Sequence, residues 1–402
     1  MWIARYFGPA EYGVFSYALA VIGILSPLAT LGLSDIAVRE IVSKPGAANQ
    51  TLVSVFALQA AGSLFVAGAA YLGVSVIRPN DEMMSHVVLI LAVTSIFQST
   101  IVAKYWFEAS VQSKYVVWIE DSILLLTACI KLALINLKVS LDTFVLVFLA
   151  ESVLMFLALY TFFFLRCKDS SLFKFSGARC KALLTESWPL VLSSLAIMLY
   201  MRMDQIMLGE MIGPEAVGIY SVAIKISELW YLIPTVIVAS YFPSIVNFKA
   251  QSDEILLEAI SGLLNLLQTV AIVVCVVVSI SAPYIVDLLF GSTYREAASV
   301  LLIHIWAVPF VFMGFAGNKW YLVQGHRMLI LHRTLVGAVV NFALNIVLIP
   351  SFGTSGAATA TVVSQSLAAY FLDASSPKTI DIFIAKTRAI FWGPVLCIRK
   401  LR

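Results

Sequence analysis

The sequence predicts an all-α polytopic membrane protein with two six-helix lobes, arranged as a parallel repeat around a central cavity. Three observations lead to this fold class: the apolar composition, a series of apolar stretches of span length, and a phrase that occurs twice. The chain of 402 residues is 61% hydrophobic and 12% charged, with a mean hydropathy of +0.95. Soluble proteins carry about 25% charged residues. Because no water-soluble core could absorb this much apolar surface, the solvent must be a bilayer.

The apolar stretches give the positions of the spans, since a helix of about 20 mostly apolar residues crosses a bilayer. In the first half they lie at 12–34, 51–77, 84–104, 116–136 and 142–165. In the second half they lie at 187–209, 216–245, 259–290, 297–324, 330–350 and 355–373. The sequence therefore predicts about eleven full spans.

The repeated phrase explains the odd number of spans. FGPAEYGVFSYALA (7–20) is echoed by IGPEAVGIYSVAIK (212–225), and both contain the pattern G-P-x-x-x-G. Proline suits the first turn of a helix and glycine a tight reversal, so each phrase predicts a hairpin into the second helix of a lobe. A full apolar span precedes the second copy, whereas only seven residues precede Gly8. We therefore expect the first helix to be largely missing. Six spans separate the copies, so they run in the same direction.

The spans divide the chain into four parts. These are an N-terminal transmembrane lobe (1–165), a basic inter-lobe loop (166–186), a C-terminal transmembrane lobe (187–373) and a basic tail (374–402). Most Lys and Arg residues outside the spans fall in the connections after even-numbered spans, which the positive-inside rule places in the cytoplasm together with the C-terminus. We interpret the apolar, basic tail as an interfacial helix rather than another span.

Five ionisable residues lie inside spans of the second lobe, where each is costly unless it has a partner or a wet cavity. We interpret Arg202, Lys225 and Lys319 as substrate-binding cations, and Asp204 and Glu228 as candidates for ion or proton coupling. Basic groups in a cavity of low dielectric attract anions strongly. The alternative is that these charges form internal ion pairs that align the helices.

Other features favour structural roles or exclude whole classes of function. We expect Lys131 and Glu151 to snorkel or to make a polar contact, and His304 to be a hydrogen-bonded interior residue. The five cysteines are scattered without C-x-x-C pairs, so neither a metal site nor a disulfide framework is expected. The patterns GxxxxGK[ST], HExxH and GxSxG do not occur, and we expect no cofactor and no enzyme activity. The net charge of +3 implies no nucleic-acid partner.

Three longer stretches carry a resemblance to a known family. They are ARYFGPAEYGVFSYALAVIGILSPLATLGLSDIAVRE, YMRMDQIMLGEMIGPEAVGIYSVAIKISELWYLIP and NIVLIPSFGTSGAATATVVSQ. The chain resembles Wzx-type oligosaccharide flippases of the multidrug/oligosaccharidyl-lipid/polysaccharide exporter superfamily. The resemblance implies twelve helices around a central cavity, alternating access, and coupling to an ion gradient.

The resemblance also implies a substrate and partners. The substrate would be an undecaprenyl-diphosphate-linked oligosaccharide, moved to the periplasmic leaflet of the bacterial inner membrane during polysaccharide or O-antigen biosynthesis. Membrane lipids and polysaccharide polymerase machinery would be the other partners. Two rivals stay open. One is a small-molecule or drug exporter of the same superfamily, with an acidic cavity. The other is a membrane polysaccharide polymerase or glycosyltransferase, against which the short extracytoplasmic connections argue.

Overall fold

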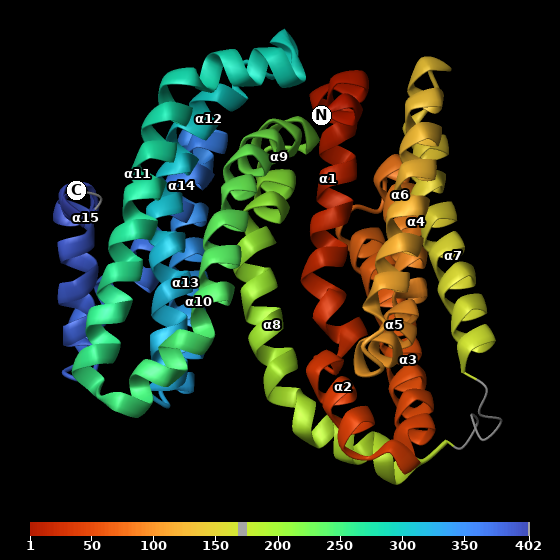
Figure 1. Cartoon of the computed structure of the whole chain (residues 1–402). Coiled ribbons are helices and arrows are strands. Elements are labelled where there is room, and N and C mark those ends of the chain that lie inside the picture. Colours follow the sequence, from red (N-terminus) through yellow and green to blue (C-terminus); the bar gives the residue numbers. More distant parts are fainter. Residues whose placement is uncertain (168–174, 401–402) are drawn as a thin grey trace. The chain divides into compact units, whose positions relative to one another are not determined.

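The computed structural model describes residues 1–167 and 175–400, and all regular secondary structure in these ranges is helical (Figure 1). Part of the predicted inter-lobe loop, 168–174, lies outside the described residues. The chain forms two compact units. One comprises Met1, Ile3–Gly13 and Met203–Arg402, and the other Trp2 and Val14–Arg202.

The unit formed mainly by Val14–Arg202 contains most of α1 and the helices that follow it up to α8. Their bounds are α1 (Trp2–Thr30), α2 (Ser34–Ser43), α3 (Ala48–Ile77), α4 (Glu82–Ile96), α5 (Ile101–Ala109), α6 (Ser113–Asn136), α7 (Leu141–Arg166) and α8 (Gly177–Met211), with short 3₁₀ turns η1 (Pro45–Ala47) and η2 (Phe97–Thr100). The core between α2, α3, α5 and α7 is aliphatic and aromatic, with Leu52, Val55, Tyr105, Phe107 and Leu159 buried in it.

The unit formed mainly by Met203–Arg402 contains the end of α8 and the remaining helices. Their bounds are α9 (Pro214–Glu228), α10 (Leu232–Gln251), α11 (Asp253–Phe290), α12 (Ala297–His304), α13 (Val308–Val323), α14 (Arg327–Ala369) and α15 (Ile380–Lys400), with 3₁₀ turns η3 (Leu229–Tyr231), η4 (Ser292–Tyr294), η5 (Ile305–Ala307) and η6 (Phe371–Ser375). The predicted span 84–104 of the first half is interrupted by the 3₁₀ turn η2, and the predicted span 297–324 of the second half by η5.

Nine helical segments of the described residues are long and apolar enough to cross a membrane. The difference from the eleven predicted spans has two physical causes. The helix α6 forms as predicted, but Glu120, Asp121 and Lys131 place three charged residues within its apolar stretch. The predicted spans at 330–350 and 355–373 are both contained in α14, which breaks at Gly353 (φ 58°, ψ −135°). A Cβ on Gly356 would lie 2.2 Å from the Leu348 carbonyl oxygen, so the chain folds back sharply at this break.

Both repeated phrases place a glycine with positive φ directly before a proline. Gly8 (φ 74°, ψ 177°) interrupts α1, and Gly213 (φ 134°, ψ 177°) separates α8 from α9, with Pro9 and Pro214 directly after them. Positive φ is inexpensive only for glycine. The sequence prediction of a glycine–proline break at both places is therefore confirmed.

The start of α8 explains why the compact units do not coincide with the predicted lobe boundaries. Residues 177–186, predicted as loop, form the first turns of α8. Arg179 forms an ion pair with Glu40 and donates to Thr51 Oγ1 at 3.0 Å, and Glu186 forms an ion pair with Arg39 at 2.6 Å. These contacts attach the beginning of α8 to α2 and α3. The predicted lobes remain a prediction about functional domains.

The predicted interfacial tail contains α15, which packs along α11 (Figure 1). Its Lys386 is fully buried and forms an ion pair with Asp373 at 2.7 Å. Arg333 pairs with the same carboxylate, and Tyr321 donates a hydrogen bond to it. Two cations from α14 and α15 therefore share one buried carboxylate, which fixes the start of α15 against the helices of its unit.

Candidate functional site

The site is built on the hairpin between α8 and α9. Gly213 supplies the reversal and Pro214 occupies the first turn of α9, where its missing N–H has no cost. The two helices are joined by polar pairs on either side of the turn. Tyr220 Oη donates to Asp204 at 2.6 Å, and Gln205 Nε2 donates to Ser221 Oγ at 3.2 Å.

Asp204 is the centre of a polar cluster in the interior of the unit formed mainly by Met203–Arg402. Its side chain lies inside a predicted span, and the residue is 4% exposed. Besides the Tyr220 hydroxyl, its carboxylate accepts from Asn345 Nδ2 at 2.6 Å and from the Thr361 hydroxyl. Asn345 and Thr361 lie on the two sides of the Gly353 break, so the fold-back of α14 brings both to the same carboxylate.

The hydrogen-bond donors that contact the Asp204 carboxylate in this cluster are uncharged side chains. Within the described part of the chain, Asp204 forms no ion pair with a Lys, Arg or His. Two further amide atoms, Asn345 Oδ1 and Asn341 Nδ2, are buried without a hydrogen-bond partner. Asn341 Oδ1 meanwhile accepts from Asn345 Nδ2 at 3.2 Å. The buried carboxylate and the unsatisfied oxygen Asn345 Oδ1 are both acceptors, so a proton or a small cation would be stabilised beside them, whereas Asn341 Nδ2 is a donor.

Polar contacts extend from this cluster to α12. His304 is 3% exposed, and its Nδ1 lies 3.0 Å from Ser227 Oγ. Its ring packs edge-on against Tyr220, with 6.1 Å between ring centroids. The prediction that His304 is a hydrogen-bonded interior residue is confirmed.

The predicted cations lie on different elements and have different partners. Lys225 is exposed on α9, and its Nζ donates to Tyr12 Oη at 2.6 Å. Lys319 is half-buried on α13, with its Nζ 4.6 Å from the centroid of the Phe242 ring. Arg202 is half-buried on α8, and a Cβ on Gly23 would lie 3.9 Å from its Cγ.

In the structure, Asp204 forms hydrogen bonds with neutral residues and not with the other predicted charged residues. Glu228 ends α9 and is half-buried. The assignment of Arg202, Lys225 and Lys319 to substrate, and of Asp204 and Glu228 to coupling, remains a prediction. Lys131 and Glu151 form an ion pair at 2.5 Å, which confirms the expected polar contact.

Sequence reasoning missed the residues that surround Asp204, because it considered only ionisable side chains inside spans. The sequence nevertheless contains a pattern that indicates these residues. Asn341 and Asn345 stand four residues apart in an apolar stretch, so they share a helix face. Buried polar groups require partners, and such a pair indicates a polar neighbour on another helix.

The two repeated phrases pack directly against each other. A Cβ on Gly13 would lie 1.7 Å from the Pro214 carbonyl oxygen, and a Cβ on Gly218 would lie 2.0 Å from the Pro9 carbonyl oxygen. The contact is reciprocal: each glycine lies against the proline of the other copy. Only residues without a side chain allow two helix backbones to approach so closely.

The sequence has relatives among proteins of known family. The family model described as "Polysaccharide biosynthesis protein" matches residues 1–249, and the MatE model matches residues 189–347. Two similar proteins of Haloferax volcanii are the probable flippase AglR, 30% identical over 218 residues, and the probable low-salt glycan biosynthesis flippase Agl15, 26% identical over 208 residues. These matches cover 51% and 49% of this chain. The chain spans less than half the length of these relatives, 44% and 42%.

Solved structures show the same fold at low identity. A structure described as the lipid II flippase MurJ in an inward closed conformation has a TM-score of 0.72 and 15% identity, covering 99% of this chain and 88% of that one. An inward-facing multidrug resistance MATE transporter of the MOP superfamily has a TM-score of 0.71 and 14% identity, covering 99% and 95%. The fold of this chain is that of these multi-pass membrane proteins. With the family model matched over more than half of its length, the chain belongs to the polysaccharide biosynthesis protein family.

Proposed function

We propose that this protein is a flippase that carries a polyprenyl-diphosphate-linked oligosaccharide across the membrane by alternating access. The family match supports the class, and the relatives named as flippases support the cargo. We propose undecaprenyl diphosphate as the carrier, the bacterial inner membrane as the location, a cytoplasmic C-terminus, and polysaccharide or O-antigen assembly with a polymerase as the pathway.

The observation that carries a transport mechanism is Asp204. An ionisable group inside a membrane is costly, and such groups are typically retained for ion or proton pathways. Asp204 receives three neutral donors, from Tyr220, Asn345 and Thr361. Binding of a proton or a monovalent cation would neutralise the charge of the Asp204 carboxylate. It would also change which hydrogen bonds the carboxylate can accept. That change would bias the helices α8, α9 and α14 between two arrangements. Glu228 is the second coupling candidate.

Arg202, Lys225 and Lys319 are the proposed contacts for the diphosphate. Charge-assisted hydrogen bonds from such cations to phosphate are stronger than neutral ones. Lys225 is engaged by the Tyr12 hydroxyl in this structure, so it would have to exchange this partner for a phosphate oxygen during transport.

The substrate assignment is tested by flipping of a fluorescent lipid-linked oligosaccharide in proteoliposomes. Arg202→Ala and Lys225→Ala should each lower the rate about tenfold, the equivalent of one charge-assisted contact. Lys378→Ala, which removes an exposed cation outside the proposed site, should leave the rate unchanged. Full rates in both Arg202→Ala and Lys225→Ala would show that these cations do not bind the cargo.

The coupling assignment is tested with imposed gradients of pH and of Na⁺ in the same vesicles. Asp204→Asn keeps the side-chain shape but cannot change charge, so the response of the flipping rate to the gradient should disappear. Asp287→Asn, an exposed acid of α11, serves as the matched control. Comparison of the two gradients identifies the coupling ion. A gradient response that persists in Asp204→Asn would remove Asp204 from the mechanism.

The match of residues 189–347 to the MatE model favours one second candidate, a small-molecule exporter. The two candidates differ in cargo charge. An exporter of cations would move a cationic dye and would be improved by Lys225→Ala, whereas a flippase of diphosphate lipids would be impaired by the same change.

A further inference from the structure

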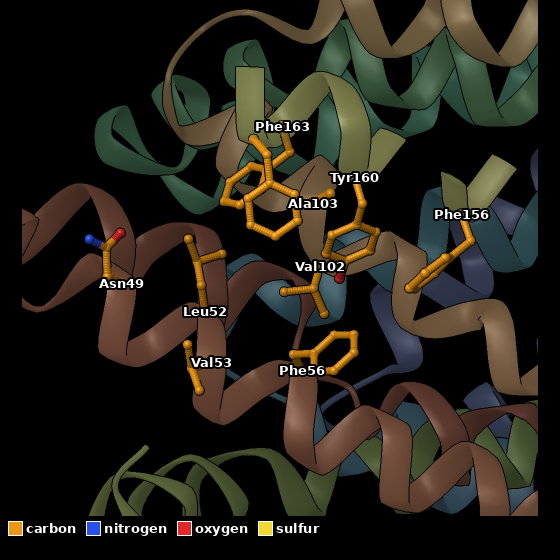
Figure 2. A pocket seen from close by; sticks show the side chains of 10 residues that line it. Asn49, Leu52, Val53, Phe56, Val102, Ala103, Phe156, Tyr160 and Phe163 are labelled. Carbon is orange, nitrogen blue, oxygen red and sulfur yellow. The ribbon is translucent and has the colours of Figure 1, made fainter. Parts of the chain in front are cut away.

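The unit formed mainly by Val14–Arg202 contains an apolar cavity whose walls are formed by three membrane-spanning segments. Its volume is about 390 Å³, and Figure 2 shows the side chains that line it. The start of α3, the start of α5 and the end of α7 line it with Asn49, Leu52, Val53, Phe56, Val102, Ala103, Phe156, Tyr160, Phe163 and Phe164. None of the predicted transport residues is among them, so the cavity is separate from the site described above.

The lining determines which kind of molecule can fill this space. Nine of the ten residues present hydrocarbon or an aromatic ring, and the Tyr160 hydroxyl is already committed to the Ser99 carbonyl at 3.0 Å. Water enters a cavity only where several polar partners are available, and apolar cavities stay dry. The aromatic side chain of Phe164 is 51% exposed, so the cavity is open toward the surroundings of the helix. In a bilayer the molecule that meets this opening is a lipid chain.

The lining of the cavity along α7 extends over most of the thickness of one leaflet. The lining residues of α7 run from Phe156 to Phe164, and Arg166 ends the helix. The helix from Phe156 to Phe164 rises about 12 Å, and the end of the helix at Arg166 lies about 15 Å from Phe156. The second length is half of the roughly 30 Å hydrocarbon core. A phospholipid acyl chain has this reach, whereas a long polyprenyl chain would extend past the end of the cavity.

The mouth of the cavity carries positive charge. Arg166 is exposed, and its guanidinium lies 4.5 Å from the Tyr115 ring centroid and 5.3 Å from that of Phe162, which holds it in place. Arg179 donates to Thr51, the neighbour of the lining residue Leu52. Lys44 precedes α3 and shares the single carboxylate of Glu40 with Arg179. Among the described residues, the three cations Arg166, Arg179 and Lys44 thus exceed the one carboxylate of Glu40, while Arg39 is paired with Glu186.

We propose that this cavity is a binding site for an anionic phospholipid of the leaflet at the Arg166 end. One acyl chain occupies the space between α3, α5 and α7, and the phosphate is bound by Arg166, with Arg179 and Lys44 contributing to the field. The site is independent of the proposed transport function, because it needs neither Asp204 nor the proposed cargo contacts.

A native tryptophan reports on the cavity. The Trp106 ring centroid is 5.4 Å from that of Phe163, a lining residue, and Trp106 follows Val102 and Ala103 by about one turn of α5. Full-length protein in nanodiscs of phosphatidylcholine is titrated with phosphatidylglycerol that carries bromine in the middle of its acyl chains. We expect saturable quenching of tryptophan fluorescence at low mole fraction, and loss of this component in Trp106→Phe.

Matched variants distinguish the cavity from the general lipid surface. Val53→Phe fills the cavity and should abolish the saturable component, as should Ala103→Leu if the first variant folds poorly. Val347→Phe, an exposed position of α14, should have no effect. Arg166→Gln should weaken the apparent affinity about tenfold, the equivalent of one charge-assisted contact.

Three results would overturn the proposal. Quenching that survives Val53→Phe and Ala103→Leu would place the lipid elsewhere. Equal quenching by brominated phosphatidylcholine would show that the site does not recognise anionic headgroups. Displacement of the brominated lipid by undecaprenyl phosphate at lower concentration than by phosphatidylglycerol would identify a polyprenyl lipid as the occupant.

Discussion

Asp373 illustrates how strongly a single residue constrains this protein. Its buried carboxylate accepts from Arg333, Lys386 and Tyr321 at once. Lys386 Nζ also donates to the Ala369 carbonyl at 2.7 Å. The Nη1 atom of Arg333 is buried without a hydrogen-bond partner. The Asp373 carboxylate is therefore the main group that offsets the cost of burying the charges of Arg333 and Lys386.

Removal of this carboxylate should cost more than removal of either cation. Asp373→Leu leaves two buried charges without a counter-ion, and breaking a buried ion pair in this way costs about 3–5 kcal/mol. Lys386→Met leaves Asp373 paired with Arg333 and should cost less. Thermal unfolding in detergent measures both. If Asp373→Leu and Lys386→Met lowered the melting temperature equally, the shared-carboxylate description would fail.

Much of the Asp204 site could be located from sequence, but its composition could not. The cost of a charge inside a span singled out Asp204, and the glycine–proline phrase placed α8 beside α9. The donors from α14 depend on the fold-back at Gly353, which brings Asn345 and Thr361 to one point. Their separation along the chain gives no local signal of this contact. Arg202, Lys225 and Lys319 stand on separate elements, and periodicity alone could not assign their partners.

At the scale of elements, the reciprocal contact between the two repeated phrases has a direct consequence for stability. A methyl group on Gly13 would lie 1.7 Å from the Pro214 carbonyl oxygen, so the helices would have to separate. We expect Gly13→Ala and Gly218→Ala to lower the melting temperature of the purified protein by several degrees, the effect of about 1–3 kcal/mol of overpacking.

The control for this prediction is a glycine with free space around it. A Cβ on Gly73 of α3 would have no atom within 4 Å, and alanine is the better helix former. Gly73→Ala should therefore leave the melting temperature unchanged or raise it. A similar loss in Gly73→Ala and Gly13→Ala would show that close packing is not the cause.

The elements themselves followed from the sequence more fully than their packing. The apolar stretches gave the spans, including α6 and the two parts of α14. The start of α8 was predicted as part of the inter-lobe loop, yet ion pairs of Arg179 and Glu186 with α2 stabilise it as helix, together with the hydrogen bond from Arg179 to Thr51 of α3. The packing of α15 on α11 was missed for a similar reason. A lysine such as Lys386 indicates a surface segment in the sequence. In the structure it is buried because it forms an ion pair with Asp373.

At the scale of the whole molecule, the distribution of Lys and Arg predicts the orientation in the membrane. In a background without the native cysteines, Lys378→Cys should react with a membrane-impermeant maleimide only from the cytoplasmic side. Asn80→Cys, in the connection between α3 and α4, should react only from the opposite side. Reaction of both positions from the same side would contradict the predicted topology.

The mutual contact of Gly13 with Pro214 and of Gly218 with Pro9 also bears on how chimaeras of such proteins can be assembled. The segment Ile3–Gly13 belongs to the same compact unit as Met203–Arg402, although about two hundred residues separate them. A recombinant that takes its first dozen residues from one parent and its second half from another would pair mismatched surfaces. Fusion points should keep both phrases from a single parent.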